Sequence, residues 1–99
     1  MEITVGQIVD YRLSNEDALY LAQYAVDNPD EHRRGNTPFA GQTLPMIVTA
    51  VNGNLINGQV FLDARATYWV ANVSEGGAVR TWSWPKRVES SSNLPIYPR

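Results

Sequence analysis

The stretch 60–85, VFLDARATYWVANVSEGGAVRTWSWP, constrains the fold more than any other part of the chain. It holds all three tryptophans, two strand patterns and two turn signals. Side chains alternate between the two faces of a strand, so Arg80, Trp82 and Trp84 are expected on one face of a strand over 78–84. Such a row either covers a small core or presents a flat surface of indole and guanidinium groups to a ligand.

Turn signals divide the rest of the chain into further short strands. Asn52-Gly53 predicts a hairpin, because both residues tolerate positive φ, and Asn57-Gly58 inside the next strand indicates a β-bulge or a slightly longer loop. In the fourth strand, alternation places Trp69 and Val73 on one face, with Tyr68 and Val70 on the other. The five expected strands cover 6–13, 44–51, 55–63, 67–73 and 78–84.

One helix is expected directly after the first strand. Ser14 and Asp17 have the spacing of a capping box, with aspartate in place of the usual glutamate. Asn28-Pro29 ends this helix, since the residue before a proline avoids the α region. The polar loop 27–43 follows, with its positive charge concentrated at His32, Arg33 and Arg34. The apolar residues that follow helical spacing are Ala18, Leu19, Ala22, Ala25 and Val26.

These elements predict a mainly β fold. Five short strands with tight turns favour a small, SH3-like antiparallel barrel, because closure removes the exposed edges of a flat sheet. A single domain is expected over 1–87, with a helix-loop insertion at 14–43 and an extended tail over 88–99, where Leu94 to Pro98 suit a polyproline-like conformation. An open sheet with the helix packed across one face is the alternative.

Composition excludes several classes of function. The net charge of −2 provides no broad positive field, which argues against non-specific nucleic-acid binding. Without cysteine and with one histidine, the chain has no disulfides and lacks the ligands of a zinc site. Neither a signal peptide nor a membrane-spanning run is recognisable, and no cofactor is expected.

Several parts of the sequence resemble a family of small, mostly uncharacterised proteins of tailed bacteriophages and prophages. Members usually read Thr-Trp-His-Trp-Pro near the end, where this chain has Ser83 in place of the histidine, and many carry glycine where it has Ala64. The resemblance implies a phage origin and residence in the host bacterial cytoplasm, and it supplies no established activity. It rests on VGQIVDY (5–11), PMIV (45–48), QVFLD (59–63), TYW (67–69), SEG (74–76) and TWSWP (81–85).

Aromatic and basic residues form the candidate binding site. Aromatic faces stack on bases, and arginine pairs with phosphate, so together they could hold a nucleotide. Solvated loops and core packing are the plainer interpretation of the same residues. The candidate ligand-binding residues are Tyr68, Trp69, Arg80, Trp82, Trp84, Lys86, Arg87, Arg33 and Arg34.

Three functions remain open. The first is a non-enzymatic phage protein that sequesters a cyclic-nucleotide or ADP-ribose-type signal of bacterial immunity, with its pocket shared between the subunits of a homo-oligomer. The second is a protein-protein interaction or virion accessory module that contacts a phage or host protein through its tryptophans. The third is a small hydrolase using Asp63 or Glu75, although neither a nucleophile elbow nor a phosphate loop is present. We expect no catalytic and no metal-binding residues.

Overall fold

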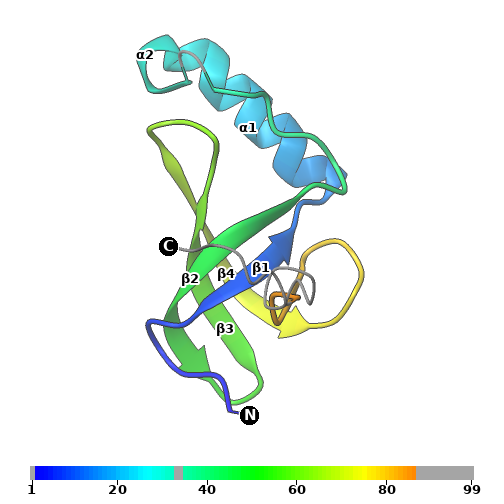
Figure 1. Ribbon diagram of the computed structural model, residues 1–99. Coiled ribbons are helices and arrows are strands. Elements are labelled where there is room, and N and C mark those ends of the chain that lie inside the picture. Colours follow the sequence, from blue (N-terminus) through cyan, green and yellow to red (C-terminus); the bar gives the residue numbers. More distant parts are fainter. Residues whose placement is uncertain (1, 33–34, 87–99) are drawn as a thin grey trace, which may run out of the picture.

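A five-stranded barrel with a helical insertion makes up the computed structural model, which describes residues 2–32 and 35–86 (Figure 1). Its elements are β1 (Ile8–Arg12), α1 (Asn15–Asp27), α2 (Pro29–His32), β2 (Thr43–Asn52), β3 (Leu55–Phe61), β4 (Thr67–Glu75) and β5 (Thr81–Ser83). The strands close a barrel in the order β1-β2-β3-β4-β5. The predicted mainly β fold, a small closed barrel with a helix after the first strand, is confirmed. The tail expected over 88–99 lies outside the described residues.

Closure of the barrel uses one parallel pair. The neighbours β1–β2, β2–β3, β3–β4 and β1–β5 are antiparallel, as expected for this fold. Strands β4 and β5 run parallel, with Ser74 opposite Thr81 and Glu75 opposite Trp82. Parallel neighbours normally need a crossover of a dozen residues or more. Here the turn 76–80 suffices because the parallel pairing is confined to the last two residues of β4.

The last strand is shorter than the sequence predicts. A strand was expected over 78–84, but only Thr81–Ser83 is extended and paired. Arg80 has φ 62°, in the left-handed region that a non-glycine residue adopts at a cost. Its N–H donates to the carbonyl of Arg12 at 2.7 Å, which holds this conformation in place. Arg80 therefore lies in a turn and does not continue the strand face of Trp82 and Trp84, which corrects the expected row.

A second irregularity changes the faces of β4. Regular alternation would place Val70 and Val73 on opposite sides of the strand, yet both are buried in the core. Asn72 lies between them with φ 57°, and its N–H donates to Asn57 Oδ1 at 2.9 Å. The β3–β4 register shifts between Ile56 and Gly58 at the same place. The irregularity lies opposite the predicted Asn57-Gly58, but the extra residue is on β4, where three residue steps from Val70 to Val73 face two steps on β3. This insertion lets both valines point inward.

Helix α1 begins where the sequence predicts but buries a different side. Ser14 and Asp17 form the reciprocal capping box, and Asn28 caps the other end. Asp17 and Leu21 are the buried residues of α1, whereas Leu19 and Val26 are exposed. In Figure 1 the helix leaves one end of the barrel instead of lying across its sheet. Within the described residues, neither helix has the length and apolar character needed to cross a bilayer.

The core fills the barrel and continues to the base of α1. Leu21 of the helix joins side chains from all five strands, so the insertion shares the hydrophobic core of the barrel. The buried apolar residues are Val9, Tyr11, Leu13, Leu21, Leu44, Met46, Val48, Ile56, Val60, Leu62, Val70, Val73 and Trp82.

Gly58 is a buried glycine of β3 at which the core packing leaves no room for a side chain. A Cβ added there would lie 2.5 Å from Met46 Cγ and 2.8 Å from the carbonyl oxygen of Ile47. We expect Gly58→Ala to lower the free energy of unfolding by about 1–3 kcal/mol through overpacking. At Gly77 an added Cβ meets nothing within 4 Å, so Gly77→Ala should change it by less than about 0.5 kcal/mol. Urea unfolding measures both, and equal effects would contradict the packing described.

Candidate functional site

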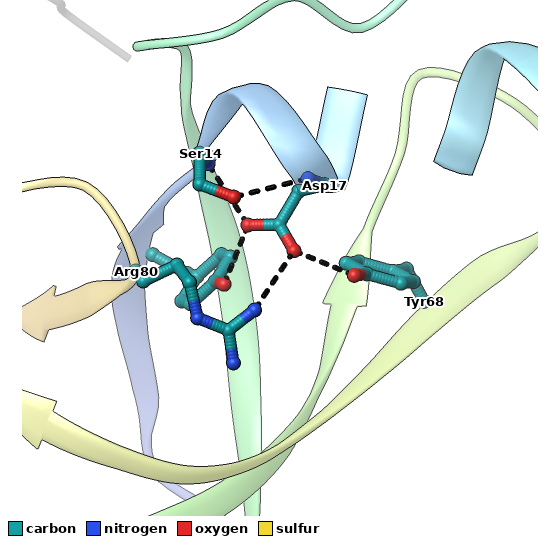
Figure 2. A network of polar contacts seen from close by, with 5 residues as sticks. Ser14, Asp17, Tyr68 and Arg80 are labelled. Carbon is teal, nitrogen blue, oxygen red and sulfur yellow. Dashed lines mark hydrogen bonds and ion pairs between the residues drawn. The ribbon is translucent and has the colours of Figure 1, made fainter. Parts of the chain in front are cut away.

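Polar side chains from three parts of the fold converge on the carboxylate of Asp17 (Figure 2). Asp17 Oδ2 accepts from the Ser14 N–H at 2.8 Å and from the Tyr11 hydroxyl at 2.7 Å. Its Oδ1 accepts from the Tyr68 hydroxyl at 2.6 Å and from Arg80 Nη1 at 3.3 Å. Only 1 % of the Asp17 side chain is exposed. We refer to these five residues as the Asp17 cluster; it joins β1, α1, β4 and the turn before β5.

Burial and hydrogen bonding shift the pKa values of this cluster in definite directions. Burial by itself raises the pKa of Asp17, but hydrogen bonds from Ser14, Tyr68 and Tyr11 outweigh it and leave the pKa below the ordinary aspartate value. Burial, together with the hydrogen bond to Asp17 and its charge, raises the pKa of both Tyr11 and Tyr68 well above the usual tyrosine range. Asp17 is therefore charged, and both phenols remain protonated donors, at neutral pH.

The Asp17 cluster is built for structure and is poorly suited to catalysis. An ionised carboxylate has about four acceptor positions, and here each oxygen already receives two donors. Asp17 consequently has no open position at which to take a proton from a substrate. The contribution of Arg80 is smaller than that of the phenols, because its side chain is 48 % exposed and makes one 3.3 Å contact.

The tryptophans, expected together on one surface, are separated. Trp82 is 4 % exposed and belongs to the core, because β5 lies between β1 and β4 with this side chain turned inward. Its indole therefore cannot stack on a ligand, which corrects that prediction. Trp84 is half-buried and meets Trp82 edge to face, with ring centroids 5.4 Å apart. Trp69 is 54 % exposed on the outside of β4.

The remaining candidate residues divide between two hollows of different chemistry. The first, which we call the aromatic groove, lies between α1 and the start of β4 and has a volume of about 420 Å³. Its lining contains the expected Tyr68 and Trp69. The complete lining is Tyr20, Leu21, Tyr24, Thr67, Tyr68 and Trp69.

The second hollow, which we call the cationic hollow, lies beside β1 and β5 and has a volume of about 730 Å³. It contains the expected Trp84 and Lys86 together with Arg12, which was not among the residues predicted from the sequence. Arg12 donates from Nε to the Gly41 carbonyl at 3.3 Å and from Nη1 to the Gly77 carbonyl at 3.0 Å. These bonds fix the guanidinium in place. The lining is Asp10, Arg12, Thr43, residues 76–78, Thr81, Ser83, Trp84, Pro85 and Lys86.

Two sequence signals could have identified the residues that were missed. Tyr20 and Tyr24 are four apart on a predicted helix, and this spacing places them on one face. Arg12 follows Tyr11 on a predicted strand, so alternation turns its side chain outward once Tyr11 is buried. The expected site residues Arg33, Arg34 and Arg87 lie outside the described residues.

The carboxylates of Asp63 and Glu75, considered above for hydrolysis, lie in different surroundings and form no common site. Asp63 Oδ2 accepts hydrogen bonds from both the backbone N–H and the side-chain amide of Asn36. These bonds connect the loop before β2 to the loop after β3. Asp10 lines the cationic hollow, whereas Glu75 lines a third hollow beside Trp82. Over residues 2–30 and 35–86, no three Asp or Glu side chains are grouped as they would be around a metal ion.

Comparisons with known proteins add no family to these observations. No protein-family model, no curated protein and no solved structure matches the chain.

Removing the charge of Asp17 tests the role of the cluster. Asp17→Asn replaces one acceptor oxygen of the carboxylate by an NH2 group. The two donors that bind this oxygen in the wild type would then face another donor. We expect the free energy of unfolding to fall by about 2–4 kcal/mol. Glu16→Gln is the matched control, since Glu16 lies in the same helical turn but is exposed, and it should cost less than about 0.5 kcal/mol. Similar losses in both variants would show that the Asp17 cluster is unimportant for stability.

The lowered pKa of Asp17 also predicts how stability depends on pH. Because the pKa is lower in the folded chain than the ordinary value of about 3.9, the unfolded chain binds more protons in acid. This contribution is complete above about pH 5 and is lost as the pH falls through the folded pKa. Urea unfolding between neutral and strongly acid pH should show a smaller acid loss for Asp17→Asn than for the wild type. An unchanged pH profile, with Glu16→Gln for comparison, would contradict the assignment.

Proposed function

We propose that the chain is a phage-encoded, non-enzymatic binding protein that sequesters a small, anionic, nucleotide-derived signal of bacterial immunity. Its binding site is the cationic hollow. The observation that carries the proposal is the presence of a half-buried indole, a fixed guanidinium and an ammonium group in one hollow, on Trp84, Arg12 and Lys86.

Each part of a nucleotide has a partner among these residues. The Trp84 ring offers a surface on which a base can stack. Arg12 donates from Nε and Nη1 to backbone carbonyls, and within the described part of the chain its Nη2 has no acceptor, so the two N–H groups of Nη2 remain for a phosphate. Lys86 adds a second positive charge at the rim. Asp10 provides an acceptor for a ribose hydroxyl or a base amino group.

Sequestration needs affinity and no reaction, which suits the chemistry of this hollow. Its lining includes one carboxylate, Asp10, and Ser83 has no histidine beside it in the sequence. A second copy that covers the open side would enclose the ligand further, as in the expected homo-oligomer. The phage origin and the host cytoplasm rest on the sequence resemblance described above.

The outer face of the sheet favours a second candidate, an interaction with a phage or host protein. Ile8 pairs with Ile47, Ile47 with Gln59, and Gln59 with Trp69, so these four outward side chains form one row across β1–β4. Ile8 and Trp69, at the two ends of the row, are exposed. An exposed indole in such a row is typical of the anchor of a protein interface. This function would depend on Trp69 and be indifferent to Lys86.

Calorimetry against cyclic dinucleotides, cyclic trinucleotides and ADP-ribose derivatives tests the first candidate. We expect at least one ligand to bind, and Trp84→Ala to weaken it by about 1–3 kcal/mol through loss of stacking. Lys86→Ala, at an exposed position, should also weaken it and make binding less sensitive to salt. Phe61→Ala, on the outside of β3 away from the hollow, is the control and should bind normally. If none of these ligands binds to the wild type at millimolar concentration, the proposal is wrong.

A further inference from the structure

The aromatic groove carries an inference that is independent of the cationic hollow. Tyr20 stacks on Tyr68, with ring centroids 5.6 Å apart, and on Tyr24, with centroids 6.3 Å apart. The three rings are within 29° of parallel in each pair, and the exposed indole of Trp69 adjoins them. The groove therefore presents a ladder of aromatic rings between α1 and β4.

The chemistry of this lining selects a particular kind of occupant. None of its six residues carries a charge, so a phosphate or carboxylate group has no counter-charge in the groove. The hydroxyl of Tyr68 is occupied by Asp17, which fixes the orientation of that ring. A fixed aromatic ladder suits proline rings, and an extended polyproline helix carries unpaired carbonyls that can accept hydrogen bonds.

The chain itself contains a segment of this chemistry. Residues 94–99 read LPIYPR and lie outside the described residues. Pro95 and Pro98 are three residues apart, and the polyproline helix has three residues per turn. In that conformation the two prolines share one face at a separation of about 9 Å. Leu94 and Tyr97 add apolar side chains beside them.

We infer that the segment Leu94 to Pro98 binds in the aromatic groove of its own molecule as an extended polyproline helix. The length of the chain permits it. Lys86 lines the cationic hollow together with Arg12, and from Arg12 three residue steps to the start of α1 and five helical residues lead to Tyr20 of the groove, about 18 Å in all. From Lys86, the last described residue, eight residue steps lead to Leu94 and span up to about 26–29 Å.

The indole N–H resonance of Trp69 in the full-length protein reports directly on the groove. Spectra of wild type and of the double variant Pro95→Ala/Pro98→Ala should differ at the Trp69 resonance, assigned with Trp69→Phe. The resonance of Trp84, which lines the cationic hollow, should stay in place. A Trp69 resonance that is identical in wild type and tail variant would overturn the inference.

A synthetic peptide of residues 90–99 provides the second arm. Added to the tail variant, it should return the Trp69 resonance toward its wild-type position. Tyr20→Ala in the same background should weaken the binding of the peptide about tenfold, whereas Val51→Ala, at an exposed apolar position outside the groove lining, should leave its affinity unchanged. A peptide that binds equally well to the Tyr20→Ala protein, or to wild type and tail variant alike, contradicts occupation of the groove by the tail. Neither arm depends on whether a nucleotide binds in the cationic hollow.

Discussion

The helical insertion has few apolar contacts with which to hold its orientation, since Asp17 and Leu21 are the buried residues of α1. Its attachment therefore depends on the carboxylate of Asp17, which receives donors from β1, from the helix N-terminus, from β4 and from the turn before β5. A buried charge is costly to desolvate unless its hydrogen bonds are made. Here the four donors satisfy it, and the same bonds connect segments that are 63 residues apart in sequence.

The hydrogen bonds of Asp17 also determine which side chains line the two hollows on the surface of the protein. Tyr68 is held by its hydroxyl, so its ring becomes a wall of the aromatic groove. Arg80, whose left-handed backbone is fixed by the carbonyl of Arg12, turns toward Asp17 and leaves the strand face. The positive charge of the cationic hollow consequently comes from Arg12 and Lys86. The molecule thus has an uncharged aromatic surface and a separate cationic surface, each suited to a different class of ligand.

Short sequence motifs correctly predicted the features that depend only on residues close together in the chain. The capping box at Ser14 and the hairpin at Asn52-Gly53 follow from side-chain hydrogen bonding and from the backbone freedom of glycine and asparagine. The pairing is irregular at Asn57-Gly58 as well, but the extra residues belong to the neighbouring strands β2 and β4. Asp17 was recognised as a cap, but its bonds to Tyr68 and Arg80 join distant segments and have no sequence signature. Long-range contacts of this kind become visible only when the barrel is closed.

The misplaced tryptophans have a similar explanation. Alternation of side chains along a strand holds while φ stays extended, and it fails at Asn72 and Arg80, where φ is positive. Neither residue is a glycine, so the sequence did not indicate a positive φ at these two positions. The row of Arg80, Trp82 and Trp84 was therefore expected on a surface, whereas closure between β1 and β4 puts Trp82 in the core.

The central claim is that one carboxylate couples the helical insertion to two sides of the barrel. A double-mutant cycle of Tyr11→Phe and Tyr68→Phe tests it most directly, because these hydroxyls bind different oxygens of Asp17. If the coupling passes through Asp17, their effects on the free energy of unfolding should be non-additive by about 0.5 kcal/mol or more. Additive losses, within about 0.3 kcal/mol, would contradict the claim and leave the helix held by packing alone.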